Sequence, residues 1–272
     1  MAPIKFDDIP KVSKSVLDDD YQVSGHQLVG KNKTNLGGAV LTTTIDIGKD
    51  AVKTPAKLGW KFPKPFGVAG VSVDKLEMDK SGKYKLEVSC SKDFHKVPDL
   101  AMDFKTDMVN LAKATKSVTY TGVKDMRVSF ETKPASPMDF TYEATKAMGL
   151  ATVGLKGSGM KFPDLGIRIL SGPYFCSLLA KEKGKAITAN LFYKVSDDLK
   201  VACTYQQGGK TSGNYSAGIA YALSKTMSMK AKMAQDMSVC ASVKYELAKG
   251  LTVLAGCKYA KDLSYGVKVS ID

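Results

Sequence analysis

Basic side chains recur at alternate positions along most of this chain, and this spacing is its most informative chemical pattern. Lys230 and Lys232, for example, alternate with Met229, Ala231 and Met233. Alternate residues of a strand point to one face, so such cations would line one side of a sheet. That face would attract anions and would need no catalytic step. The basic residues at the middle of predicted strands are Lys61, Lys85, Lys105, Arg127, Lys156, Arg168, Lys194, Lys200, Lys230, Lys232, Lys244, Lys258 and Lys268.

The overall charge agrees with an anionic partner. The 272 residues include 40 Lys+Arg and 27 Asp+Glu, which gives a formal net charge of +13. Composition alone leaves nucleic acid, an acidic membrane surface and small anions open as partners. Acidic residues on the same predicted face should keep any anion preference modest, and they are Glu87, Asp103, Asp107, Glu131, Glu143 and Glu246.

Other chemistry has little support in the sequence. The five cysteines contain no CxxC pair, so we expect neither disulfides nor a zinc site. The run GLKGSG (154–159) lacks the spacing of a phosphate-binding loop and suits a glycine-rich strand end better. We therefore predict no metal, no cofactor and no enzymatic activity.

Residues 6–20 are the one convincing helical segment. Phe6, Ile9, Val12, Val16 and Leu17 form a stripe of helical spacing, and Lys11, Lys14 and Asp18–Asp20 lie on the other side. Asp7 and Asp8 are expected to cap its start, with Pro10 in the first turn. The prediction is a short amphipathic helix that docks on an apolar surface.

After Tyr21 the period changes to two. At the end of the chain Leu263, Tyr265, Val267, Val269 and Ile271 fall on one face, and Ser264, Gly266, Lys268 and Ser270 on the other. Short turn signals such as SDD, AQD, AKG and AKD separate similar two-faced stretches. The pattern predicts an all-β meander of about nineteen strands. We divide the chain into a helical segment over 1–20 and a β-barrel over 21–272.

The apolar face of this sheet is expected to look outward. A closed barrel of so many strands is too wide for side chains to fill its lumen, so a soluble version could not bury its apolar face. Placed in a membrane, the apolar face meets lipid and the basic face meets water. Closure also pairs every backbone group within the hydrocarbon. Tyrosines are candidates for the interfacial girdles, namely Tyr120, Tyr142, Tyr193, Tyr221, Tyr245, Tyr259 and Tyr265.

Two stretches resemble the mitochondrial porins, the voltage-dependent anion channels. FDDIPKVSKSVLDDDY (6–21) is similar to their N-terminal helix, with matches at Phe6, Asp8, Ile9, Lys11, Val16, Leu17 and Tyr21. The terminal stretch resembles the closing signal of mitochondrial β-barrels, with matches at Ser264, Gly266, Val269 and Ile271. Barrels of this family have nineteen strands, so our count is not independent of the resemblance. An odd count requires the first and last strands to pair in parallel.

The resemblance implies a voltage-dependent, weakly anion-selective channel of the mitochondrial outer membrane. It would pass ATP, ADP, phosphate and small ions by diffusion, with the N-terminal helix inside the lumen. The implied gating helix comprises Phe6, Ile9, Lys11, Lys14, Val16 and Leu17. The expected partners are outer-membrane lipid and the permeant nucleotides and anions, with a homo-oligomer or other mitochondrial membrane proteins left open. The start of the chain has no signal-peptide core and too many aspartates for a transit peptide.

Two departures from the family pattern bear on the helix. The family has a glycine-rich hinge after the helix, whereas YQVSGHQLVG contains only Gly25 and Gly30. The family also has a lysine near the helix end, where this chain has three aspartates, Asp18–Asp20. These acids should weaken the attraction of nucleotides at that point.

Besides a structural, lipid-embedded subunit of a larger complex, two specific functions remain as alternatives. The first is the pore subunit of the mitochondrial protein translocase, a related barrel for which a longer N-terminal extension is expected. The second is a soluble, basic nucleic-acid-binding β-protein. It should carry aromatic stacking platforms among its basic residues, and we find none on the lysine face.

Overall fold

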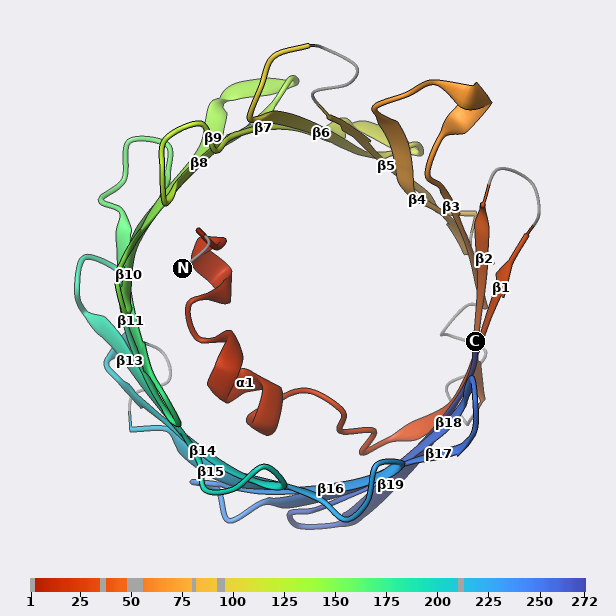
Figure 1. Ribbon diagram of the computed structural model, residues 1–272, viewed down its shortest axis with the longest axis vertical. Helices are drawn as coiled ribbons and strands as arrows, with labels where there is room; N and C mark the ends of the chain where they lie inside the picture. Colours follow the sequence, from red (N-terminus) through yellow and green to blue (C-terminus); the bar gives the residue numbers. More distant parts are fainter. Residues whose placement is uncertain (1–2, 35–37, 48–55, 80–81, 92–95, 210–212) are drawn as a thin grey trace.

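The protein is a closed β-barrel with a short helix inside it (Figure 1). The computed structural model describes residues 3–34, 38–47, 56–79, 82–91, 96–209 and 213–272. Across these residues nineteen strands form one sheet, as predicted. Strand lengths run from 6 residues in β3 to 13 in β9.

The strands are β1 (Gly25–Lys33), β2 (Val40–Ile47), β3 (Lys57–Phe62), β4 (Val71–Asp79), β5 (Tyr84–Cys90), β6 (Leu100–Asp107), β7 (Asn110–Tyr120), β8 (Met126–Lys133), β9 (Ser136–Met148), β10 (Ala151–Ser158), β11 (Asp164–Ser171), β12 (Tyr174–Lys181), β13 (Ala186–Lys194), β14 (Leu199–Gln207), β15 (Tyr215–Ala222), β16 (Met227–Ala234), β17 (Val239–Ala248), β18 (Leu251–Tyr259) and β19 (Leu263–Ile271). The helical elements are η1 (Phe6–Asp8), α1 (Lys11–Leu17) and η2 (Pro65–Gly67).

The barrel closes where β1 meets β19. Consecutive strands pair antiparallel, whereas β1 and β19 run parallel, with register from Gly25↔Gly266 to Gly30↔Ile271. An odd number of strands in an up-and-down order requires this parallel pair. The predicted parallel closure is therefore confirmed. Both β1 and β19 have a hydrogen-bonded strand on each side, whereas in an open sheet they would be edge strands.

The apolar faces of the strands point outward. Ile167, Leu191 and Ile219 are 37%, 55% and 47% exposed, although each belongs to a β-strand. In water such a continuous apolar surface would be unstable, and in a bilayer it is the surface that lipid covers. Six of the seven tyrosines proposed for the girdles are exposed, and Tyr142 is half-buried.

No helix among the described residues is both long enough and apolar enough to cross a membrane.

The helical segment is shorter and more broken than predicted. Instead of one helix over 6–20, the 3-10 turn η1 precedes the seven-residue helix α1. Pro10 explains the break, because it has no N–H to bond the carbonyl of Phe6, which accepts instead from Ile9 N–H at 3.1 Å. The capping prediction was wrong: Pro10 is the N-cap residue of α1, and no side chain caps either element.

Candidate functional site

The lumen face of the barrel carries all thirteen predicted basic residues. Lys156 and Lys230 contact the N-terminal segment (residues 3–24), which lies inside the ring. Residues directly opposite each other on neighbouring strands share a face. Register pairs such as Lys194↔Lys200 and Arg168↔Thr152 extend this face around the barrel to the other basic residues. These basic residues form a cationic lining of the lumen, which we call the wall.

Five strand glycines let the N-terminal segment lie close to that wall. Added Cβ atoms at Gly154 and Gly166 would come within about 3 Å of Ile9 or Phe6 side chains, and one at Gly218 would lie 2.9 Å from Leu17. At Gly256 and Gly266 the Cβ would meet backbone atoms of Gln22 and Gly25 at 2.6 and 2.5 Å. We call these residues the glycine track: Gly154, Gly166, Gly218, Gly256 and Gly266. It accommodates the segment from η1 to the connection with β1.

The apolar stripe of the segment faces the wall. Phe6 and Ile9 pack against Leu179, while Val16 and Leu17 pack against Ala202, Phe192 and Ala220. These four segment residues are at most 3% exposed. Fully burying one such side chain contributes about 1.5–3 kcal/mol, so the stripe is the main source of docking free energy. Lys11 and Lys14 are exposed on the opposite side, as the helical pattern predicted.

Two lysines bind the carbonyl end of α1. Lys230 Nζ donates to Ser15 O at 2.8 Å and to Asp19 O at 3.1 Å, and Lys232 Nζ donates to Leu17 O at 2.5 Å. The last carbonyls of a helix have no partners within the helix and carry partial negative charge. The two ammonium groups satisfy these carbonyls and complement the helix dipole.

The aspartates after α1 reach the same lysines. Asp20 Oδ2 lies 3.4 Å from both Lys230 Nζ and Lys244 Nζ, and Asp18 Oδ1 lies 3.9 Å from Lys232 Nζ. Asp20 has a left-handed backbone with φ 60°. We call Lys230, Lys232 and Lys244 the lysine cluster.

Tyr21 joins this end of the segment to the wall. Its hydroxyl donates to Val16 O at 3.1 Å, and Lys232 Nζ lies 4.7 Å from the ring centroid. Burial raises the pKa of the Tyr21 phenol, with smaller contributions from Cys240 and Asp18. The phenol therefore stays protonated and remains a hydrogen-bond donor at neutral pH.

The start of the segment is held by β9 and β10. Thr145 Oγ1 donates to Ile4 O at 2.5 Å, and Lys156 Nζ contacts Asp7 Oδ2 at 2.6 Å. On the wall nearby, Arg127 pairs with Glu143, and both side chains are less than 15% exposed. The segment is thus fixed at both ends by polar contacts and between them by apolar packing.

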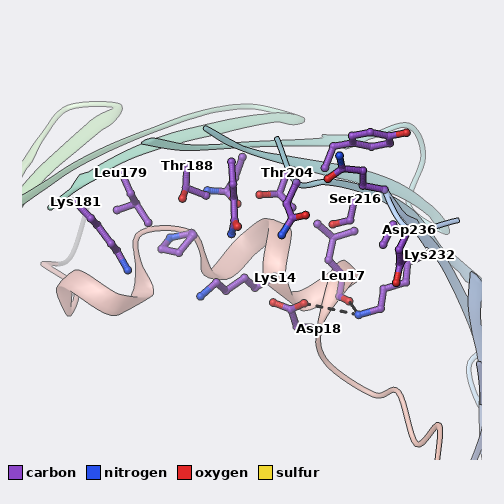
Figure 2. Close-up of a pocket in the computed structure, with 17 residues that line it drawn as sticks. Lys14, Leu17, Asp18, Leu179, Lys181, Thr188, Thr204, Ser216, Lys232 and Asp236 are labelled. Atoms are coloured by element: carbon purple, nitrogen blue, oxygen red, sulfur yellow. Dashed lines mark hydrogen bonds and ion pairs between the residues drawn. The ribbon is translucent and has the colours of Figure 1, made fainter. Parts of the chain in front are cut away.

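A cavity of about 450 Å³ lies between α1 and strands β12–β16 (Figure 2). Polar side chains contribute much of its lining, with Thr188, Thr204 and Ser216 on the wall and Lys14 on the helix. Lys232 stands at one end, with interactions drawn to Leu17 and Asp18. The space beside the helix is therefore lined by both polar and apolar groups.

The predicted basic residues fall into two groups. Within the described part of the chain, seven have an acidic partner within 4 Å: Lys61, Arg127, Lys156, Lys194, Lys230, Lys232 and Lys244. No such pair is found between described residues for Lys85, Lys105, Lys200, Lys258 or Lys268. Arg168 donates to Thr152 at 3.3 Å. The five lysines of the second group contribute positive charge to the lumen face without a described acidic partner.

The proposed assembly-signal residues all belong to β19. Gly266 lies opposite Gly25, and Val269 and Ile271 lie opposite Leu28 and Gly30 in the parallel pair. Ser264 Oγ donates to Lys258 O at 3.4 Å. Three of the four positions therefore stand where the barrel closes.

Sequence reasoning missed the residues that receive the segment. Thr145 and Gly218 carried no signal of their own, because strand threonines and glycines occur for many reasons. Assigning the register of every strand pair would have shown that the residues of the glycine track share the lumen face. Turn signals alone do not determine that register.

This geometry defines a class of protein. A closed barrel with an apolar outside and a charged, water-accessible lumen is a membrane channel. Among the described residues no group of three or more His, Cys, Asp or Glu side chains could hold a metal ion.

Comparison with known proteins gives the family. A model of the eukaryotic porin family matches residues 2–260, and the chain therefore belongs to this family. It is an outer-membrane pore protein whose wall contacts lipid and whose lumen passes small solutes. Eukaryotic porins are channels rather than enzymes. Among curated proteins, none matches the chain.

Similar solved structures include mutants of the Rhodopseudomonas blastica porin. A triple mutant has 9% identity and a TM-score of 0.49, covering 91% of this chain and 95% of its own. A mutant with five substitutions has 10% identity and a TM-score of 0.48, covering 80% and 97%. These scores are below 0.5, so the family assignment rests on the sequence match.

Proposed function

We propose that this chain is a voltage-dependent, weakly anion-selective channel of the mitochondrial outer membrane. It passes ATP, ADP, phosphate and small ions by diffusion. The observation that supports this most is the repetition of lysine and arginine on the lumen face of a wide barrel. Membership of the eukaryotic porin family supports the mitochondrial location.

The selectivity follows from charge. A cationic wall raises the concentration of anions in the lumen and lowers that of cations. Lumen acids such as Glu143 and Asp103 oppose it, and ion pairs neutralise part of the lysine charge. A modest preference for anions is the expected result.

Lumen lysines without an acidic partner among the described residues provide the test of selectivity. A variant with Lys200, Lys258 and Lys268 changed to Gln should lose most of its chloride preference in a planar bilayer, while its conductance steps persist. The matched control changes Lys124, Lys183 and Lys225, which lie in turns between strands. An equal loss in both variants would mean that net charge, rather than the lumen face, sets selectivity.

Voltage dependence is assigned to movement of charge with residues 1–20, the segment that we treat as functionally separate from the barrel at 21–272. Moving one charge across the membrane field is worth about 2.3 kcal/mol per 100 mV. Within the segment, Phe6, Ile9, Lys11, Lys14, Val16 and Leu17 would form the moving unit. Deletion of residues 1–20 should abolish or flatten the voltage response. An unchanged response in the deletion variant would refute the helix-based mechanism.

A further inference from the structure

The N-terminal segment is acidic, although the rest of the chain is strongly basic. From Lys5 to Asp20 it has three lysines and five aspartates, a side-chain charge of 3 − 5 = −2. Because the whole chain carries +13, the remainder carries 13 + 2 = +15. The segment therefore brings negative charge into a cationic lumen.

The acids of the segment lie against lysines of the wall. Asp20 contacts both Lys230 and Lys244 at 3.4 Å, Asp18 lies 3.9 Å from Lys232, and Asp7 contacts another wall lysine, Lys156, at 2.6 Å. Four of the thirteen predicted lumen cations are therefore neutralised in part by the docked segment.

The positive charges of the segment do not cancel this effect. Lys11 pairs with Asp8 at 3.4 Å, within the segment itself. Lys14 lines the cavity beside α1 together with Asp18. The segment thus adds more carboxylate than ammonium charge to the space through which solutes pass.

We propose that the docked N-terminal segment lowers the anion preference of the lumen, and that Asp18 and Asp20 are the residues that set this level. The inference rests on the proposed anion-selective function. The bare wall is the more anion-selective surface. A state in which the segment leaves the lumen therefore discriminates against cations more strongly than the docked state.

The size of the effect follows from Coulomb's law. A unit charge about 10 Å from a permeating ion in water, screened at about 0.1 M salt, changes the anion-to-cation permeability ratio just under two-fold. Removing the charges of Asp18 and Asp20 should therefore raise the chloride-to-potassium ratio about three-fold.

The experiment measures reversal potentials across a KCl gradient, with about 0.1 M on the dilute side. It compares the wild type with Asp18→Asn/Asp20→Asn and with a control, Asp198→Asn/Asp262→Asn, which makes the same charge change in the β13–β14 and β18–β19 turns. Both control side chains are exposed, and neither forms an ion pair with a described lumen lysine. We expect the ratio to rise about three-fold in the first variant and to stay near wild type in the control.

Two further variants separate charge from shape and docking. Asp20→Glu keeps the charge and should keep the wild-type ratio, whereas deletion of residues 1–20 should raise the ratio. An unchanged or lower ratio in Asp18→Asn/Asp20→Asn, or a fall on deletion, would overturn the inference. If the deletion variant does not insert into the bilayer, the permeability ratio of Asp18→Asn/Asp20→Asn decides the question.

The outcome is distinguishable from failure of the proposed function. A wild type that prefers cations would contradict the proposed function. The difference between variant and wild type would still show whether the segment acids oppose anion preference.

Discussion

Replacing Lys230 with Met should release the N-terminal segment from the wall. Lys230 Nζ donates to Ser15 O at 2.8 Å and to Asp19 O at 3.1 Å, and its side chain is only 14% exposed. Methionine keeps the length of the apolar stem but removes both donors. The two carbonyls at the helix end would lose their charged partner.

The expected loss of docking free energy is about 2–4 kcal/mol. A hydrogen bond to a charged group contributes about 1.5–3 kcal/mol, and two are lost, although water in the lumen replaces part of each. The third contact, to Asp20, adds little to this loss, because the Asp20 carboxylate is more than a third exposed. At 1.4 kcal/mol per factor of ten, the undocked fraction should rise by about 30-fold or more.

Thiol labelling can measure this fraction. Ser13 belongs to α1 and is 0% exposed in the docked segment. In a background without the five native cysteines, Ser13→Cys should therefore react only when the segment undocks. Lys230→Met should speed labelling by about 30-fold. Lys200→Met is the matched control, because Lys200 shares the lumen face and, among the described residues, forms no ion pair or side-chain hydrogen bond with the segment. Equal labelling rates in the two variants would refute the role of Lys230 in holding the helix.

Two more substitutions test the packing and the wall. Gly256→Ala should accelerate labelling of the cysteine at position 13, because the added Cβ would lie 2.6 Å from Gln22 O. Gly30→Ala is the control and should leave the labelling rate unchanged, because its added Cβ has nothing within 4 Å. Similar labelling rates in the two variants would rule out the glycine track as a docking surface. Arg127→Gln should lower the free energy of denaturant unfolding in micelles by about 3 kcal/mol, because it leaves Glu143 buried and unpaired. Lys133 forms an exposed ion pair with Asp139, so Lys133→Gln should lower the free energy of unfolding by at most about 1 kcal/mol. Comparable losses in Arg127→Gln and Lys133→Gln would contradict the argument.

The barrel was predictable because its two-residue period is repeated in almost every strand. Leu263 to Ile271, for example, showed which face is apolar, and barrel width then decided which way that face looks. The parallel closure of β1 on β19 followed from the odd strand count, which drew on the family resemblance as well as on the turn signals. The two-residue period itself is a local property that a sequence displays directly.

The position of the helix was not predictable in the same way. The stripe of Phe6, Ile9, Val16 and Leu17 indicated a docking face but not the surface that receives it. That surface combines residues from strands far apart in the sequence, such as Leu179 and Ala202. The break at Pro10 was misjudged because proline suits a first helical turn, and here it also ends the preceding one.

The roles of individual lysines also required the structure. Lys230 and Lys200 look alike in the sequence, since each alternates with apolar residues in a strand. In three dimensions Lys230 binds the helix end, while Lys200 lies beside Lys194. Only long-range contacts distinguish a lysine that holds the segment from one that faces the lumen.

The most direct test of the account is the reversal potential of the wild-type protein. The refolded chain is inserted into a planar bilayer, and the potential at zero current is measured across a KCl gradient. The account predicts large stepwise conductance with a mild preference for chloride, because the lumen face carries excess lysine. A preference for potassium would contradict the anion channel and favour the translocase pore, and a failure to insert would contradict the membrane barrel itself.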